Sequence, residues 1–206
     1  MSRILRAILF PLAVLLALPM GLASALAEQK LETAIFAGGC FWCVEADFDK
    51  VDGVRETLSG YIGGNGGPVS YETHAGLGYR EAVQIRFDPA VVSYERLVEL
   101  FFRSVDPTDD GGQFCDRGHS YTTAIYAVGE DQLALAEQGR DAAIKALGRV
   151  VATEILPAGE FFPAEYYHQD FYRKNGFRYE FYRINCGRDL VLSRLWGARA
   201  WAAARH

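Results

Sequence analysis

Beyond its first 30 residues, the sequence lacks the features that mark repeat proteins, interdomain linkers and membrane spans. It has no internal repeat, no low-complexity segment, no proline- or serine-rich linker, and no further apolar run as long as the one at the N-terminus. One domain over residues 28–206 is therefore the simplest organisation. Hydrophobic residues make up 50% of the chain and charged residues 23%, an ordinary composition for a domain with a real core.

Basic residues are also in short supply, with 21 Lys and Arg against 26 Asp and Glu and a formal net charge of −5. Such an acidic chain is a poor partner for nucleic acid or for an anionic membrane surface, so we expect neither. A phosphate loop is missing as well, because the glycine-rich run 63–67 lacks the Lys-Ser/Thr that such a loop needs. Only Cys40 and Cys43 have the spacing of metal ligands, and without a second pair we expect no bound metal.

The first 27 residues have the layout of a secretory signal peptide. Arg3 and Arg6 provide the positive start, residues 8–22 are apolar, and residues 25–27 (ALA) supply the small residues of a cleavage site. We therefore expect residues 1–27 to be removed, leaving a periplasmic or secreted protein with no stable membrane association. An uncleaved anchor is the alternative, but prolines and a glycine interrupt the short apolar run. Cleavage removes two positive charges and no negative charge, so the net charge of −5 becomes −7.

Four cysteines remain after this cleavage, namely Cys40, Cys43, Cys115 and Cys186. Two structural disulfides are the default interpretation for an exported chain. However, a mature chain of this length does not need disulfides in order to fold. Redox catalysis is the competing interpretation, and the residues around Cys40 favour it.

The pattern of apolar residues predicts an α+β fold with two layers rather than a doubly wound sheet. Strands and helices do not alternate regularly, and residues 106–120 form a polar loop long enough to suggest a function. The expected strands cover 33–37, 54–62, 81–87, 121–128 and 150–156, and the expected helices begin at Cys40, after Ser93 and at Glu130.

Cys40 stands directly after a buried strand and at the first turn of the next helix. Unpaired backbone N–H groups and the positive end of the helix dipole favour the thiolate at such a position, and the thiolate is the nucleophile. Gly38 and Gly39 are expected to leave the approach to sulfur open. Phe41 and Trp42 provide an adjoining apolar surface.

Residues 38–45 (GGCFWCVE) resemble the active-site signature of the A-type peptide methionine sulfoxide reductases. The resemblance covers about residues 33–180, in the order and spacing of that family. Further segments that carry it are 60–64 (GYIGG), 80–89 (REAVQIRFDP), 106–108 (DPT), 116–126 (DRGHSYTTAIY), 163–165 (PAE) and 167–169 (YHQ).

This resemblance implies a two-layer α+β sandwich with a ferredoxin-like core and a mixed sheet. It implies reduction of the S epimer of methionine sulfoxide, free or in oxidised proteins, by a chain that binds no cofactor. The family commonly draws its electrons from thioredoxin, so we expect a thioredoxin-like dithiol partner, and an exported copy needs a donor in its own compartment. We expect a monomer.

The resemblance also assigns roles to individual residues of this sequence. A sulfoxide sulfur becomes electrophilic when its oxygen is stabilised and protonated, which calls for a soft nucleophile, an acid and hydrogen-bond donors. The implied roles are Cys40 as nucleophile, Phe41 and Trp42 as the pocket for the S-methyl group, Glu81 as the acid, Tyr71 and Tyr121 as donors to the oxygen, and Asp116 as a residue that orders the site.

The recycling cysteine is where the sequence departs from the family pattern. The family's segment after YHQ carries a resolving cysteine, and Glu180 occupies that place here. Cys186, six residues later, is our first candidate for the thiol that condenses with the oxidised Cys40. Cys43 is the second, because Cys-x-x-Cys is a workable redox spacing at a helix start, and Cys115 is the third.

Other polar residues receive a structural interpretation. We expect His168 to be structural, His74 and His119 to lie in surface loops, and Glu45 to be a solvated carboxylate on a helix face. We expect the segment 188–206 to be a packing or loosely ordered tail. Two alternative functions remain open: a thioredoxin-like disulfide oxidoreductase that uses Cys40 and Cys43, and a catalytically silent binding domain with structural disulfides.

Overall fold

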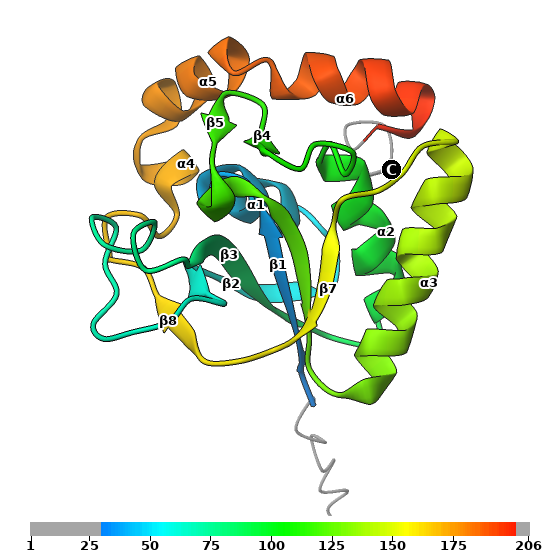
Figure 1. Ribbon diagram of the computed structural model, residues 1–206, viewed down its shortest axis with the longest axis horizontal. Helices are drawn as coiled ribbons and strands as arrows, with labels where there is room; N and C mark the ends of the chain where they lie inside the picture. The colour runs from blue at the N-terminus through cyan, green and yellow to red at the C-terminus, as the bar shows by residue number, and fades with distance from the viewer. Residues whose placement is uncertain (1–29, 201–206) are drawn as a thin grey trace, which may run out of the picture.

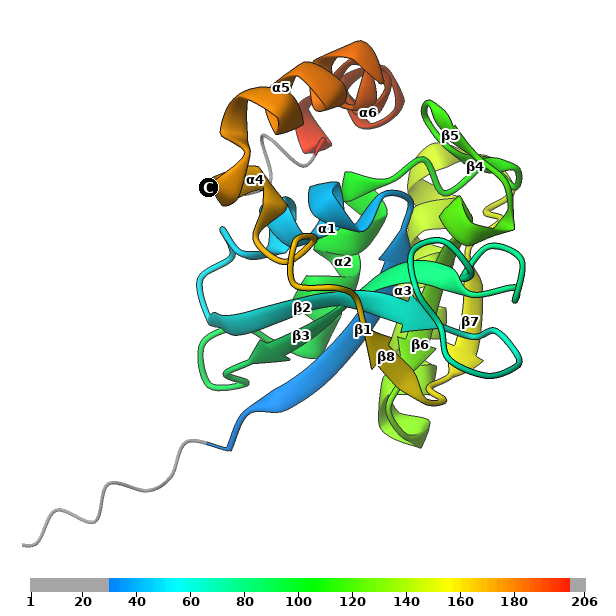
Figure 2. The same ribbon diagram turned by 90° about the vertical axis from the view of Figure 1, so that its left-hand side faces the viewer.

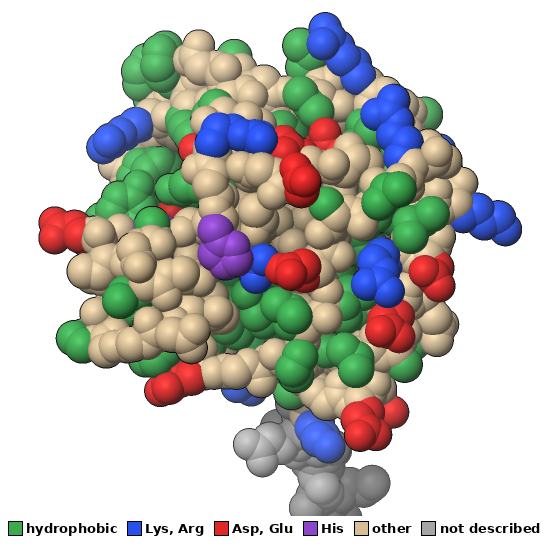
Figure 3. All heavy atoms as spheres, viewed as in Figure 1, with side chains coloured by type: hydrophobic (Ala, Val, Ile, Leu, Met, Phe, Trp, Pro, Cys, Tyr) green, Lys and Arg blue, Asp and Glu red, His purple; other side chains and the backbone are tan. Residues whose placement is uncertain are grey.

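The computed structural model describes residues 30–200 (Figure 1). The predicted signal peptide lies outside this range and stays a prediction. No helix within residues 30–200 combines the length and the apolar character that crossing a membrane requires. Acidic and basic side chains are scattered over the face of the molecule seen in Figure 3.

A six-stranded sheet in the order β7-β6-β1-β3-β2-β8 forms the centre of the fold. Neighbouring strands are antiparallel except β6 and β7, so the sheet is mixed, as predicted. A separate two-stranded ribbon joins β4 to β5. The strands are β1 (Glu32–Gly38), β2 (Val54–Ile62), β3 (Arg80–Phe87), β4 (Gly112–Gln113), β5 (Asp116–Arg117), β6 (Thr123–Ala127), β7 (Glu154–Pro157) and β8 (Phe161–Pro163).

Helices complete the two-layer sandwich (Figures 1 and 2). Helices α2 and α3 lie side by side, while α5 and α6 lie over the end of the molecule that carries α1. The helices are α1 (Phe41–Phe48), α2 (Tyr94–Ser104), α3 (Glu130–Leu147), α4 (Phe171–Lys174), α5 (Gly176–Asn185) and α6 (Arg188–Trp196), with short 3-10 turns at η1 (His119–Tyr121) and η2 (Gly197–Arg199).

Strand β1 is the element that places Cys40. It pairs with β3 on one side and β6 on the other, and its residues from Ala34 to Gly38 are buried. A strand covered on both faces has a nearly continuous apolar sequence, which is why residues 33–37 predict a strand. The chain leaves the sheet at Gly38 and enters α1 at Phe41, so the end of the central strand and the start of the helix fix Cys40 between them.

The predicted α+β fold and most of its elements are confirmed. The helix after Ser93 begins as expected, and the Ser93 side chain accepts a hydrogen bond from the backbone N–H of Arg96. The long loop 106–120 contains the β4–β5 ribbon. Strand β8 and helices α4 and α5 were not expected, because short elements of this kind owe their form to tertiary packing rather than to a local pattern.

The C-terminal segment is a structural part of the domain as far as residue 200. Arg188, the first residue of α6, is fully buried, and its guanidinium donates to the carbonyl oxygens of Gly38 and Ser104. The Trp196 indole donates to the carbonyl of Val105 at 3.3 Å. Helix α6 therefore holds the end of β1 and the end of α2 in place.

Replacing Arg188 by methionine is expected to lower the free energy of unfolding by about 2–4 kcal/mol, because buried carbonyl oxygens lose their donors. Denaturant unfolding followed by tryptophan fluorescence measures this loss. Arg194→Met is the matched control, because Arg194 lies on the same helix with its side chain exposed. If the two variants lose the same free energy of unfolding, the buried contacts of Arg188 contribute no more to stability than an exposed arginine does.

Candidate active site

Cys40 is the N-cap residue of α1 and is 7% exposed. The preceding Gly39 has φ +83°, and a Cβ there would lie 2.6 Å from the Cβ of Gln113. Gly38 is tight as well, since its Cβ would meet Val44 and Val105 at 3.0 Å. The two glycines therefore permit a sharp, closely packed turn from strand to helix, and the expected open approach to sulfur stays a prediction.

A small cavity of about 50 Å³ gathers the residues to which the sequence assigned catalysis. They come from the start of α1, the loop after β2, strand β3, and the β5–η1 segment. The lining residues are Cys40, Phe41, Trp42, Tyr71, Glu81, Asp116 and Tyr121, all of them expected, together with Tyr182 from α5, which was not.

Glu81 is the buried carboxyl of this cavity, at 2% exposure. Its Oε2 accepts a hydrogen bond of 3.0 Å from the backbone N–H of Phe41, which ties β3 to the start of α1. Burial raises the pKa of Glu81 to about 8, although the bond from Phe41 opposes the shift. Glu81 is therefore largely protonated at neutral pH and able to give a proton to a substrate oxygen.

His74 also belongs to the surroundings of Glu81, and the expectation of a surface loop was wrong. Its side chain is buried, with Nε2 at 3.8 Å from Glu81 Oε1 and Nδ1 at 2.7 Å from the carbonyl oxygen of Tyr71. A lone histidine in a polar segment carries no sequence signal of burial, because the stacking of its ring on Tyr61 is a tertiary contact.

Tyr71 and Tyr121 bring two phenol groups to the same cavity. They line it together with Glu81. The backbone N–H of Tyr71 donates to Glu165 at 2.9 Å, and the other oxygen of Glu165 accepts from Tyr61. Burial raises the pKa of both Tyr71 and Tyr121, so both keep their protons as donors.

The apolar wall of the cavity is formed by Phe41 and Trp42. The Trp42 ring stacks on Phe171 with centroids 3.7 Å apart and planes 7° apart, and its Nε1 donates to His168 Nδ1 at 3.0 Å. Burial lowers the pKa of His168, which keeps the ring neutral and able to accept this bond. His168 therefore holds Trp42 in place, in agreement with its structural interpretation.

Both Cys40 and Cys43 are free thiols, and they hydrogen-bond each other. Burial, followed by the bond to Cys43, raises the pKa of Cys40 well above its usual range. The bond to Cys40 lowers the pKa of Cys43, helped by the charges of Arg188 and Arg183. Burial thus favours the thiol form of Cys40, where the sequence predicted a thiolate, and the thiolate has to be formed by proton transfer within the cavity.

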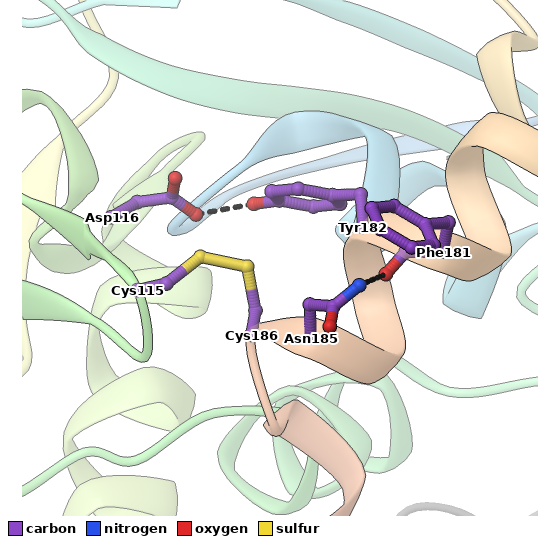
Figure 4. Close-up of a disulfide and its surroundings, with 6 residues drawn as sticks. All are labelled: Cys115, Asp116, Phe181, Tyr182, Asn185 and Cys186. Atoms are coloured by element: carbon purple, nitrogen blue, oxygen red, sulfur yellow. Dashed lines mark hydrogen bonds between the residues drawn. A yellow bond between two sulfur atoms is a disulfide. The ribbon is translucent and has the colours of Figure 1, made fainter.

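Cys115 and Cys186 form a disulfide at the edge of the site (Figure 4). Cys186 was our first candidate for pairing with Cys40, and the structure pairs it with Cys115 instead. Cys115 is exposed and Cys186 is half-buried. Within residues 30–200, one group of potential metal ligands occurs, Cys115, Asp116 and Cys186, and two of its three members are joined in this disulfide.

Tyr182 is the residue of the cavity that the sequence analysis missed. Its hydroxyl donates to Asp116 (Figure 4), and its side chain lines the same small cavity as the thiol of Cys40. It lies in the C-terminal segment that departs from the family pattern, where no motif could identify it. The sequence feature that could have identified Tyr182 is its spacing of four residues from Cys186, the residue that caps α5 at its C-terminus. Side chains four residues apart lie on the same face of a helix.

Glu45 also differs from expectation, because it is buried at 1% exposure rather than solvated. Its carboxylate accepts a hydrogen bond from the backbone of Asp170, and burial raises its pKa to about 7. It does not line the cavity. Its contact holds α1 against the segment that leads into α4.

The chain resembles known proteins in sequence and in structure. Residues 32–200 match the family described as peptide methionine sulfoxide reductase. The chain is 53% identical to peptide methionine sulfoxide reductase MsrA 2 of Rhizobium meliloti, over 84% of this chain and 87% of that protein. It is 45% identical to peptide methionine sulfoxide reductase MsrA 2 of Caulobacter vibrioides, over 94% of this chain and all of that protein (100%).

Solved structures show the same likeness. Reduced Mxr1 from Saccharomyces cerevisiae superposes with a TM-score of 0.68 at 29% identity, covering 71% of this chain and 87% of that one. Methionine sulfoxide reductase A of Corynebacterium diphtheriae superposes with a TM-score of 0.65 at 31% identity, covering 73% of this chain and 77% of that one.

Proposed function

The chain belongs to the family of peptide methionine sulfoxide reductases, and from this premise we propose that it reduces the S epimer of methionine sulfoxide, free or in oxidised proteins. One observation carries the proposal. A single cavity holds a thiol, a buried carboxyl whose pKa is raised to about 8, three phenols, and the rings of Phe41 and Trp42. These are the nucleophile, the acid, the donors and the methyl pocket that the reaction needs.

In the reductive step, the sulfur of Cys40 attacks the sulfoxide sulfur while Glu81 gives its proton to the sulfoxide oxygen. Tyr71 and Tyr121 donate hydrogen bonds to that oxygen as its charge grows, which is where preorganised donors lower a barrier. The substrate S–O bond breaks and the oxygen passes to Cys40 as a sulfenic acid. Two electrons move from the Cys40 sulfur to the substrate sulfur, and methionine leaves.

The choice of epimer follows from the two different walls of the cavity. Phe41 and the fixed ring of Trp42 take the S-methyl group, and Glu81 lies on the polar wall that takes the oxygen. Exchanging the methyl group and the oxygen puts a polar oxygen against aromatic rings, where it finds no hydrogen-bond donor, and takes it away from Glu81.

Recycling uses the disulfide seen at the edge of the cavity. The thiol of Cys186 attacks the sulfenic sulfur of Cys40 and water leaves, giving a Cys40–Cys186 disulfide. The thiolate of Cys115 then attacks the Cys186 sulfur, which releases Cys40 as a thiol and forms Cys115–Cys186. In this scheme Cys186 is the thiol that resolves the sulfenic acid, and Cys115 is the thiol that pairs with Cys186 afterwards. Cys43 is the alternative resolving thiol, and mapping the disulfide formed by Cys40 distinguishes it from Cys186.

The external reductant is a thioredoxin-like dithiol. Cys40 and Cys43 are buried, whereas Cys115 is exposed, so a protein thiol reaches the Cys115–Cys186 disulfide directly. Attack on this disulfide by the donor's first thiol, followed by its second thiol, returns both cysteines to the reduced state and leaves the donor oxidised.

We also propose that the protein is exported and works outside the cytoplasm, where its donor must be resident. Residues 1–27 support this by their signal-peptide layout. Cell fractionation of the full chain beside one lacking residues 2–27 tests it, with N-terminal sequencing of the product. Export with cleavage after residue 27 is expected for the full chain only. Retention of the intact full chain in the cytosol contradicts export.

A peptide containing methionine sulfoxide tests the proposed activity against the thioredoxin-like alternative. With dithiothreitol as reductant, we expect methionine to be formed catalytically. A disulfide oxidoreductase that uses Cys40 and Cys43 would instead reduce insulin and leave the sulfoxide untouched. Insulin reduction without sulfoxide turnover therefore overturns the proposal, and a fully silent chain favours the binding-domain alternative.

A further inference from the structure

The hydroxyl of Tyr182 lies between two groups of the active site. On one side it donates to the Asp116 carboxylate, and on the other it adjoins the thiol of Cys40 in the cavity of about 50 Å³ that both residues line. A phenol has one proton to donate and oxygen lone pairs with which to accept. With its proton on the Asp116 side, the oxygen of Tyr182 is the acceptor that faces the Cys40 S–H.

The surrounding structure holds Tyr182 in this position. Its ring lies edge-on to Trp42, with centroids 5.8 Å apart and planes at 81°. While the Cys115–Cys186 disulfide is closed, it runs as a covalent link beside the hydrogen bond from Tyr182 to Asp116 (Figure 4). In the reduced enzyme, in which Cys40 attacks, the ring contact with Trp42 remains.

The mechanism leaves open how the proton of Cys40 departs. Attack needs the thiolate, and burial holds Cys40 in its thiol form. Glu81 cannot take this proton, because it has to keep its own for the sulfoxide oxygen. The other carboxyl that lines the cavity is Asp116, which lies partly open to solvent.

We propose that Tyr182 is a further catalytic residue, which relays the thiol proton of Cys40 to Asp116. The Cys40 S–H bond breaks as its proton passes to the oxygen of Tyr182, and the Tyr182 O–H proton passes to the carboxylate of Asp116. The result is a Cys40 thiolate, a neutral Tyr182 that now donates to it, and a protonated Asp116. No electrons leave the sulfur in this step, which rests on the proposed function.

Several charged or titratable groups share this region. Cys43 is the competing proton acceptor, since it hydrogen-bonds Cys40 and its own pKa is lowered by that bond and by nearby arginines. The groups that face the relay from the elements packed around it are Cys43 of α1, Glu81 of β3, Tyr71 after β2, Tyr121 of η1 and Arg188 of α6.

Tyr182→Phe tests the relay in the fully reduced enzyme. We measure the rate at which iodoacetamide alkylates Cys40, by peptide mass spectrometry across the neutral and alkaline pH range, together with single-turnover sulfoxide reduction. We expect both rates to fall about 10- to 100-fold at neutral pH, the value of a hydrogen bond to a charged group. The alkylation rate should approach that of the wild type at alkaline pH, where the thiol ionises unaided.

Asp116→Asn should give the same defect, and the double variant should be no slower than either single variant, because both remove one path. Tyr179→Phe is the matched control on α5, since its hydroxyl accepts from Arg183. If the pH dependence of Cys40 alkylation is unchanged in Tyr182→Phe, the proposal is overturned. It is also overturned if Cys43→Ser, and not Tyr182→Phe, changes that pH dependence. If Tyr182→Phe does not fold, Asp116→Asn decides by the same profile.

Alkylation of Cys40 needs no sulfoxide, so its rate tests the relay independently of the proposed reduction of methionine sulfoxide. A wild type that alkylates with the expected dependence on Tyr182 but never reduces sulfoxide refutes the proposed function alone. A wild type that reduces sulfoxide, with a profile indifferent to Tyr182, refutes the relay alone.

Discussion

Replacing Glu81 by glutamine is expected to slow single-turnover reduction of methionine sulfoxide by about 10²- to 10⁴-fold, the usual contribution of a positioned acid. Glutamine matches the size of glutamate, and its side-chain oxygen can still accept the hydrogen bond from the Phe41 backbone. Glutamine has no acidic proton, so the oxygen must leave the substrate sulfur without receiving a proton from residue 81. Cys40 should remain reactive towards alkylating agents in this variant.

The pH dependence of the same variant gives a second readout. The pKa of Glu81 is raised to about 8 by burial, so its protonated, acidic form is present below that value and is lost above it. The reductive rate of the wild type should therefore fall as the pH rises through about 8. Glu81→Gln should lack this fall, because glutamine does not titrate.

Glu45→Gln is the matched control for Glu81→Gln. Glu45 is also a buried carboxyl with a raised pKa of about 7, and it does not line the cavity. An unchanged single-turnover rate in Glu81→Gln, or an equal loss in Glu45→Gln, would remove Glu81 from the role of acid.

Replacing Cys186 or Cys115 by serine is expected to abolish steady-state turnover with a thioredoxin-like reductant while preserving the first round of reduction. Without Cys186, the sulfenic acid of Cys40 has lost its partner, and without Cys115, the Cys40–Cys186 disulfide cannot be passed on. Cys115→Ser should therefore accumulate the Cys40–Cys186 pair, which peptide mass spectrometry detects directly.

Cys43→Ser is the control for these two variants and should keep its steady-state turnover, since recycling as proposed does not use Cys43. Normal turnover by Cys186→Ser together with loss of turnover by Cys43→Ser would reverse the ranking. The recycling pair would then be Cys40–Cys43, and the Cys115–Cys186 disulfide would be structural.

The sequence was most informative where function depends on short segments. Gly38 to Glu45 carry the turn, the nucleophile and the aromatic wall within one strand-to-helix connection, so a local pattern contained most of the site. Glu81, Tyr71, Asp116 and Tyr121 followed only through the family resemblance. No spacing in the chain brings those four side chains to Cys40. The pairing of β3 with β1 brings Glu81, and the packing of the loop after β2, of β5 and of η1 brings the other three.

The residues that sequence reasoning missed share a tertiary cause. Tyr182 and Arg188 lie beyond the segment that carries the resemblance, and each acts by reaching from a C-terminal helix to a distant backbone or side chain. His74 and Glu45 are polar residues whose burial depends on elements far away in the sequence. The partner of Cys186 was not readable either, because four cysteines allow three pairings and sequence alone does not choose between them.

The central claim is that Cys40 reduces the S epimer of methionine sulfoxide, and epimer-resolved turnover of a methionine sulfoxide peptide tests it most directly. Wild type and Cys40→Ser are incubated with dithiothreitol and each separated epimer, and the methionine formed is measured. We predict turnover of the S epimer by the wild type, none of the R epimer, and no activity in Cys40→Ser. Turnover of the R epimer alone, or full activity in Cys40→Ser, would contradict the account.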